Sequence, residues 1–223
     1  MADVTKRDFT QGPLFRACVA VYGLAGASVC FLVACIPFIA AMLVTRTAVV
    51  LVVTGFSIGP AWAALLYVMR AYATSRDIEP FQLFWRGYRL GVRQSLVFWV
   101  PYFTLLMVLG ADVFAVPNTP APVRWLIIVL GAIAVLWGST VLLIIGCFSF
   151  RLRDVLRLAL YGLIRSPRWL LSNIAIMLVT GAIVFAWSEA AAGALAAPIA
   201  LFTVLNSRTL RERLREEFTP AIG

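Results

Sequence analysis

Side chains able to do covalent chemistry are few in this chain, and their surroundings argue against catalysis. The 223 residues include no histidine, so serine, threonine and cysteine lack the base that most often activates them. Four cysteines (Cys18, Cys30, Cys35 and Cys147) lie in or beside apolar segments, where a free thiol behaves as a small hydrophobe. Cys30 and Cys35 point about 140° apart on a helix, which favours neither a disulfide nor a metal site. No P-loop or glycine-rich dinucleotide turn occurs either. We therefore predict no catalytic residue, no cofactor, no metal and no enzymatic activity.

Arginine and aromatic residues are the better candidates for binding chemistry. Between residues 77 and 93, helical spacing puts Arg86, Arg89 and Arg93 on one arc and an aromatic group on another. The aromatic arc consists of Phe81, Phe84, Trp85 and Tyr88, together with Val92. This pattern predicts an amphipathic helix in the membrane interface. Two interpretations remain open: an anchor that binds anionic lipid headgroups, and a docking surface for a protein partner.

A second arginine-rich segment, residues 151–168, has a similar design, with Arg151, Arg153 and Arg157 as its first basic residues. Both segments are predicted to follow an inward-going helix and precede an outward-going one. An internal duplication explains this similarity, and so does convergence on a basic, membrane-proximal composition.

The composition of the chain predicts that transmembrane helices position these arginine and aromatic residues. The chain is 62% hydrophobic and only 13% charged, against about 25% charged residues in soluble domains. It is therefore predicted to be one all-α, polytopic membrane domain over residues 1–223. The apolar runs predict six transmembrane helices, listed here by residue range: 19–43, 48–72, 95–116, 125–149, 169–187 and 190–206. The last is short for a crossing, so five spans with a re-entrant final segment are the alternative.

Glycine and proline residues predict where these helices pack and bend. Gly55, Gly59 and Ala63 recur every four residues and form a stripe on which another helix can approach closely. Pro37 and Pro60 each remove a backbone donor and predict kinks. The carbonyl of Phe56 then needs another donor in lipid, for which Ser57 is a nearby candidate.

Charge predicts the orientation in the membrane. With six spans, all of the 19 basic residues except Arg46 and Arg124 fall on the side of the two termini. The positive-inside rule makes that side cytoplasmic, in a multi-pass protein of the cell membrane. The net charge of +9 forms no continuous groove, so a nucleic-acid partner is not expected. Asp112 and Glu189 lie near the outer helix ends, which leaves no ionisable residue at mid-membrane.

Several short motifs together resemble the YesL-like family of bacterial membrane proteins. They are Gly59-Pro60-Ala61, Ala64-Leu65-Leu66-Tyr67, Phe84-Trp85-Arg86-Gly87-Tyr88-Arg89, Trp99-Val100-Pro101 and Gly12-Pro13-Leu14. The resemblance covers about residues 12–110, and the alanine- and arginine-rich composition is similar to that of an actinobacterial member. Members commonly accompany carbohydrate ABC importers, so the resemblance implies a role in carbohydrate utilisation but no catalytic residue.

These observations lead to a functional expectation with one alternative. We expect an accessory or regulatory partner of a carbohydrate uptake system, in contact with anionic lipid headgroups and with importer permease subunits. The alternative is a small channel or facilitator formed by a homo-oligomer around the kinked helices.

Overall fold

The structure, a computed structural model, describes residues 13–44, 48–74, 79–115, 120–148, 151–186 and 189–208. This part of the chain is all-α and contains no strand, in agreement with the predicted fold class. Its helices are α1 (Pro13–Ala34), α2 (Ile36–Val44), α3 (Ala48–Gly55), α4 (Ile58–Thr74), α5 (Pro80–Ala115), α6 (Ala121–Cys147), α7 (Leu152–Arg165), α8 (Pro167–Ala186), α9 (Glu189–Ala194) and α10 (Ala196–Asn206). Both chain ends, with the arginines of the tail beyond Arg208, lie outside the described residues, so their cytoplasmic placement stays a prediction.

The described helices are long and apolar enough for four membrane spans, or five if α1 and α2 form one bent span, but not for six. The four are Val52–Thr74, Pro80–Ala111, Pro122–Cys147 and Pro167–Ala186. The predicted span at 190–206 is instead divided into α9 and α10, and α10 has only 11 residues. At 1.5 Å per residue, neither piece can cross hydrocarbon about 30 Å thick.

The first two predicted helices are both interrupted close to a proline. α1 and α2 meet at Cys35 with a bend of 56°, two residues before Pro37, and α3 and α4 meet at Phe56 and Ser57, shortly before Pro60. A missing N–H and the clash of the proline ring with the preceding turn account for both positions. The hydroxyl of Ser57 donates to the carbonyl of Thr54 at 2.8 Å, so its predicted role beside Phe56 is wrong.

The helix breaks leave backbone groups without intrahelical hydrogen bonds, and side chains from other helices form hydrogen bonds with some of these groups. The indole N–H of Trp99 on α5 donates to the carbonyl of Gly55, at the end of α3, over 3.0 Å. At the start of α10, the backbone N–H of Ala197 donates to the hydroxyl of Ser28 on α1 over 3.2 Å. Helix ends have donors and acceptors without intrahelical partners, and here distant segments supply those partners.

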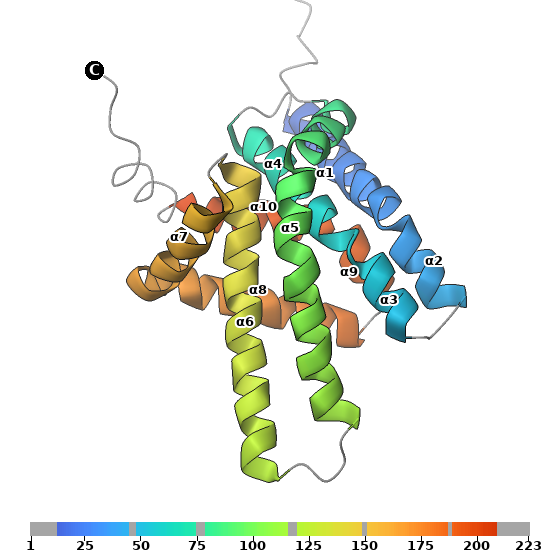
Figure 1. The fold of residues 1–223 in the computed structure, drawn as a ribbon. Helices are drawn as coiled ribbons and strands as arrows, with labels where there is room; N and C mark the ends of the chain where they lie inside the picture. The colour runs from blue at the N-terminus through green and yellow to red at the C-terminus, as the bar shows by residue number, and fades with distance from the viewer. Residues whose placement is uncertain are drawn as a thin grey trace, which may run out of the picture.

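α4 is the centre of the bundle. Its own residues are buried on all sides of the helix, as shown by Ala61, Ala63, Ala64 and Leu66, none of which is more than 3% exposed. α1, α5, α6 and α10 all pack against it, and Figure 1 shows α4 among them. The stripe on α3 and α4 makes close approaches: Gly55 lies against Phe103, Gly59 against Trp99, and the carbonyl of Ala63 against Gly146 of α6.

Two elements differ from the predicted arrangement. The segment 77–93 and the helix at 95–116 are not separate, because α5 is one helix of 36 residues with Pro101 inside it.

α8, expected to run alongside the other spans, crosses behind α5 and α6 in Figure 1. Asn173 of α8 donates to the carbonyl of Leu136 at 3.1 Å and to the hydroxyl of Ser139 at 2.7 Å, which holds α8 across α6.

Gly59→Ala tests the close approach of α4 and α5. An added Cβ would lie 2.2 Å from Cγ of Trp99, so the indole must move and lose its bond to Gly55. Overpacking of this kind costs about 1–3 kcal/mol, equivalent to a fall of several degrees in the Tm of a chain this long. We expect this fall in thermal denaturation of the detergent-solubilised protein. Gly181→Ala on α8 is the control, because its Cβ would meet nothing within 4 Å. Equal Tm values for the two variants would contradict the packing described here.

Candidate interaction site at the start of α5

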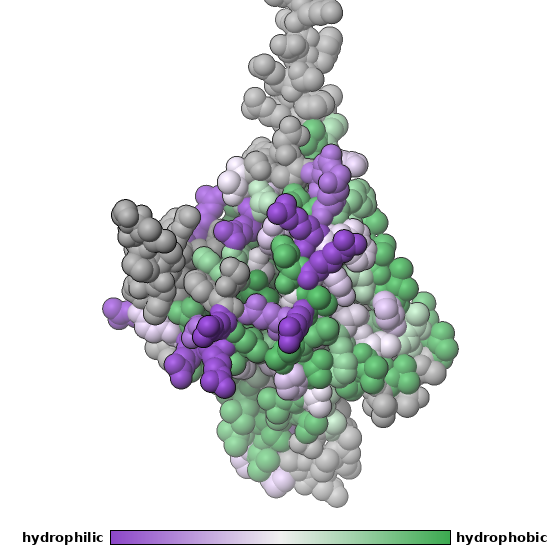
Figure 2. Space-filling view, turned by 45° about the horizontal axis from the view of Figure 1, so that its top comes forward, coloured by the Kyte–Doolittle hydropathy of each residue, from purple (hydrophilic) through white to green (hydrophobic). Residues whose placement is uncertain are grey.

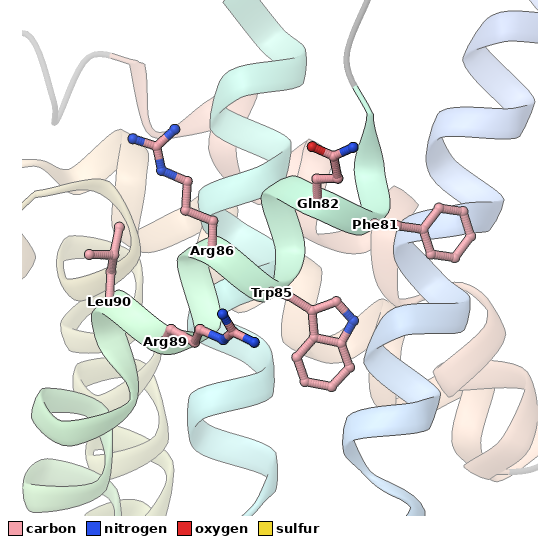
Figure 3. A pocket seen from close by; sticks show the side chains of 6 residues that line it. All are labelled: Phe81, Gln82, Trp85, Arg86, Arg89 and Leu90. Atoms are coloured by element: carbon pink, nitrogen blue, oxygen red, sulfur yellow. The ribbon is translucent and has the colours of Figure 1, made fainter.

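The first turns of α5 carry a shallow surface depression of about 580 Å³. Its wall comes from α5 alone and consists of Phe81, Gln82, Trp85, Arg86, Arg89 and Leu90. In Figure 3 this part of α5 runs across α4 before the helix turns downward, with Phe81 directed toward α1 and Arg86 pointing away from Trp85. We call these six residues the α5 face.

Aromatic packing fixes the α5 face to the core. Phe84 is fully buried, whereas its neighbour Trp85 is 42% exposed. The rings of Phe84, Trp85 and Tyr88 form one cluster, with centroids 5.7–6.3 Å apart. Gly87 lets the helix approach Tyr67 of α4, because a Cβ there would lie 2.6 Å from the tyrosine ring. The predicted aromatic arc therefore divides: Phe84 anchors the helix, Tyr88 is partly buried, and Trp85 remains on the surface.

No carboxylate in the described part of the chain compensates the charge of the α5 face. Arg86, Arg89 and Arg93 are exposed, and no described carboxylate forms an ion pair with any of them. Figure 2 shows hydrophilic side chains gathered on the end of the molecule that contains the α4–α5 and α6–α7 connections, with apolar surface beyond them. A free guanidinium beside an exposed indole can bind a carboxylate or phosphate and also pack against an apolar group.

The second arginine-rich segment forms a separate helix. In α7, Val155 and Ala159 are fully buried while Arg153 and Arg157 are exposed, and Arg151 precedes the helix as its N-cap residue. Asp154 in the first turn and Arg165 in the last complement the helix dipole. The depression on α5 contains no residue of α7. The predicted arginines therefore lie on two different helices. One group lies in the first turns of the long helix α5, and the other lies at the start of α7, a helix of 14 residues.

The predicted packing residues lie inside the bundle and not at the α5 face. Gly55, Gly59, Pro60 and Ala63 are all buried. Gly55 and Gly59 let α3 and α4 pack against the later part of α5, and Ala63 lies against α6.

Two polar residues with clear structural roles did not stand out in the sequence. The guanidinium of Arg70, at the end of α4, donates to the backbone carbonyl of Cys147 and lies 5.7 Å from the centre of the Phe148 ring. It thereby caps the carbonyl end of α6. Asn173, only 2% exposed, is the link between α8 and α6. The signal that could have revealed Asn173 is an amide within an otherwise apolar helix, since such a group needs partners in lipid.

The described residues contain no recognisable group of catalytic or metal-binding side chains. No group of three histidine, cysteine, aspartate or glutamate side chains in this part of the chain could hold a metal ion. The absence of a cofactor and of enzymatic activity stays a prediction.

Comparison with known proteins finds a family whose model matches one segment of the chain. Residues 24–113 match the family described as "Protein of unknown function, DUF624", a domain that YesL-like families carry. The matched segment runs from α1 through most of α5 and contains the motifs listed above, except Gly12-Pro13-Leu14. No curated protein and no solved structure matches the chain.

Phe84→Ala and Trp85→Ala separate packing from surface function. Removing the fully buried Phe84 ring costs about 3–5 kcal/mol because it leaves a cavity, so we expect a marked loss of thermal stability in detergent. Trp85→Ala removes a half-exposed ring and should leave the Tm almost unchanged. An equal loss in both variants would show that Trp85 belongs to the core and would remove it from the candidate site.

Proposed function

We propose that this membrane protein is a non-enzymatic accessory or regulatory subunit, and that the α5 face docks its partner. The observation that carries the proposal is the presence, on the same turns of α5, of the exposed Trp85 and two exposed arginines that no described carboxylate neutralises. Tryptophan and arginine are enriched among the residues that contribute most to protein–protein binding. The α5 face stands on a buried aromatic anchor, so docking would order few side chains and lose little conformational entropy.

The charge of the α5 face indicates the chemistry of the partner. Arg86 and Arg89 fit an acidic segment, with carboxylates for the guanidinium groups and an apolar side chain for the indole. Anionic lipid headgroups satisfy the same arginines from the membrane side. The positive-inside rule favours a cytoplasmic position for this face in the cell membrane.

The resemblance to the YesL-like family extends the proposal to an uptake system for carbohydrates, with the permease subunits of an ABC importer as partners. The family match is consistent with this extension, and the carbohydrate role itself rests on the resemblance alone. A solute channel is the less favoured function, because the large cavity inside the bundle has an almost wholly apolar wall, whereas a path for polar solutes needs polar groups along it.

Co-purification in mild detergent tests the docking role. Trp85→Ala combined with Arg89→Gln should lower recovery of the partner, identified by mass spectrometry, by roughly tenfold or more, since hot-spot residues contribute about 2 kcal/mol or more each. The amount of the variant in the membrane should equal that of the wild type, because neither side chain belongs to the core.

Arg124→Gln combined with Trp125→Ala is the matched control. It removes the same two side-chain types from exposed positions at the start of α6, at the far end of the α5–α6 hairpin in Figure 1. Unchanged partner recovery from the α5 variant, or an equal loss from both, would refute docking through this face. Recovery of importer subunits with the wild type would support the carbohydrate role.

A further inference from the structure

The bundle contains a second and deeper hollow, remote from the α5 face. A cavity of about 650 Å³ lies among α1, α2, α4, α5, α6 and the segments from α8 to α10. Its volume is within the range of about 300–1,000 Å³ typical of small-molecule sites, which are mostly apolar with a few placed polar groups.

One buried amide offers an unused acceptor in the cavity wall. Asn173 is 2% exposed and lines the cavity. Both of its described hydrogen bonds use the amide NH₂ group, which donates to Leu136 and Ser139 of α6. Within the described part of the chain, no donor reaches its Oδ1 atom. This oxygen is not among the fully buried atoms that lack a partner, so it is open to the cavity that Asn173 lines, where a ligand can donate a hydrogen bond to it.

The other polar groups of the wall narrow the choice of ligand. The hydroxyls of Thr180 and Thr203 donate to backbone carbonyls of their own helices, so their oxygens are available only as acceptors. None of the described residues in the wall is charged, and an ion would enter without a counter-charge at a prohibitive desolvation cost. The wall therefore selects an uncharged molecule that donates a hydrogen bond from an otherwise apolar body.

The edge of the cavity shows the route of entry. Met42 and Leu43 of α2 line it and are exposed, Leu43 at 82%. α1 and α2 are together long and apolar enough for one bent membrane span, and in that arrangement an opening beside α2 faces hydrocarbon. A molecule dissolved in the bilayer can reach the cavity through this apolar edge without crossing water.

We propose that this cavity is a binding site for an uncharged, single-chain lipid alcohol, whose hydroxyl donates to Oδ1 of Asn173 and whose alkyl chain fills the apolar space toward α2.

Competition between two unlabelled compounds tests whether binding to the wild-type protein requires a hydroxyl group on the ligand. The protein is placed in phosphatidylcholine nanodiscs and labelled with hexadecanol that carries a photoreactive diazirine in its chain. Unlabelled hexadecanol and hexadecyl methyl ether then compete, since the ether accepts hydrogen bonds but donates none. We expect saturable labelling of α2, α8 and α10 peptides, with hexadecanol roughly three- to tenfold more effective than the ether, the value of one net hydrogen bond.

A filling substitution tests the location. Met177→Trp enlarges a side chain of the cavity wall and should abolish the saturable labelling. Leu178→Trp, on the next residue but 69% exposed on the outside of α8, should leave it intact.

Three results would overturn the proposal: labelling that rises in proportion to probe concentration without saturating, equal competition by alcohol and ether, or saturable labelling that survives in a folded Met177→Trp protein. If Met177→Trp does not fold, the comparison of the two competitors still decides, because it uses only the wild-type chain.

Discussion

The absence of water in the hydrocarbon core is the constraint on which this structure depends. Each backbone group released by a broken helix must find a partner inside the protein, and α1–α2, α3–α4 and α9–α10 are all broken. The indole of Trp99 serves the end of α3, and the hydroxyl of Ser28 serves the start of α10. These contacts join segments far apart in sequence, so the breaks that weaken individual helices also specify which helices must pack together.

The polar side chains of the interior also find their hydrogen-bond partners inside the protein. Asn173 and Ser139 bind each other and the carbonyl of Leu136, while Trp169 donates to Thr140 at 3.1 Å. The bonds of Asn173 and Trp169 join α8 to α6, and the bond from Ser139 to Leu136 lies within α6. In lipid, van der Waals packing and hydrogen bonds replace the hydrophobic effect as the forces between helices. A small polar cluster is then sufficient to hold a helix across its neighbours.

The sequence predicted the elements that depend on local composition. The all-α class, the apolar runs and bends close to Pro37 and Pro60 follow from hydrophobicity and from proline stereochemistry. Features that depend on tertiary partners could not be derived in this way. The continuity of α5 through Arg93 and Ser95, the crossing of α8, and the cavity beside Asn173 all require knowledge of which helices meet. At the start of α5, helical spacing placed Phe84 and Trp85 in one group. Which of the two rings is buried depends on where α4 lies, and the sequence does not show this.

The central position of α4 also bears on how the chain is assembled. The segment with a family match ends at residue 113, yet Ala197, Ala200 and Val204 of α10 are fully buried in the core that α4 centres. Because α10 follows α4 by more than 100 residues in the chain, the surface of α4 that α10 covers has no such cover until α10 has been synthesised. The matched segment therefore does not contain all of the helices that enclose α4, because α10 lies beyond it and packs against α4.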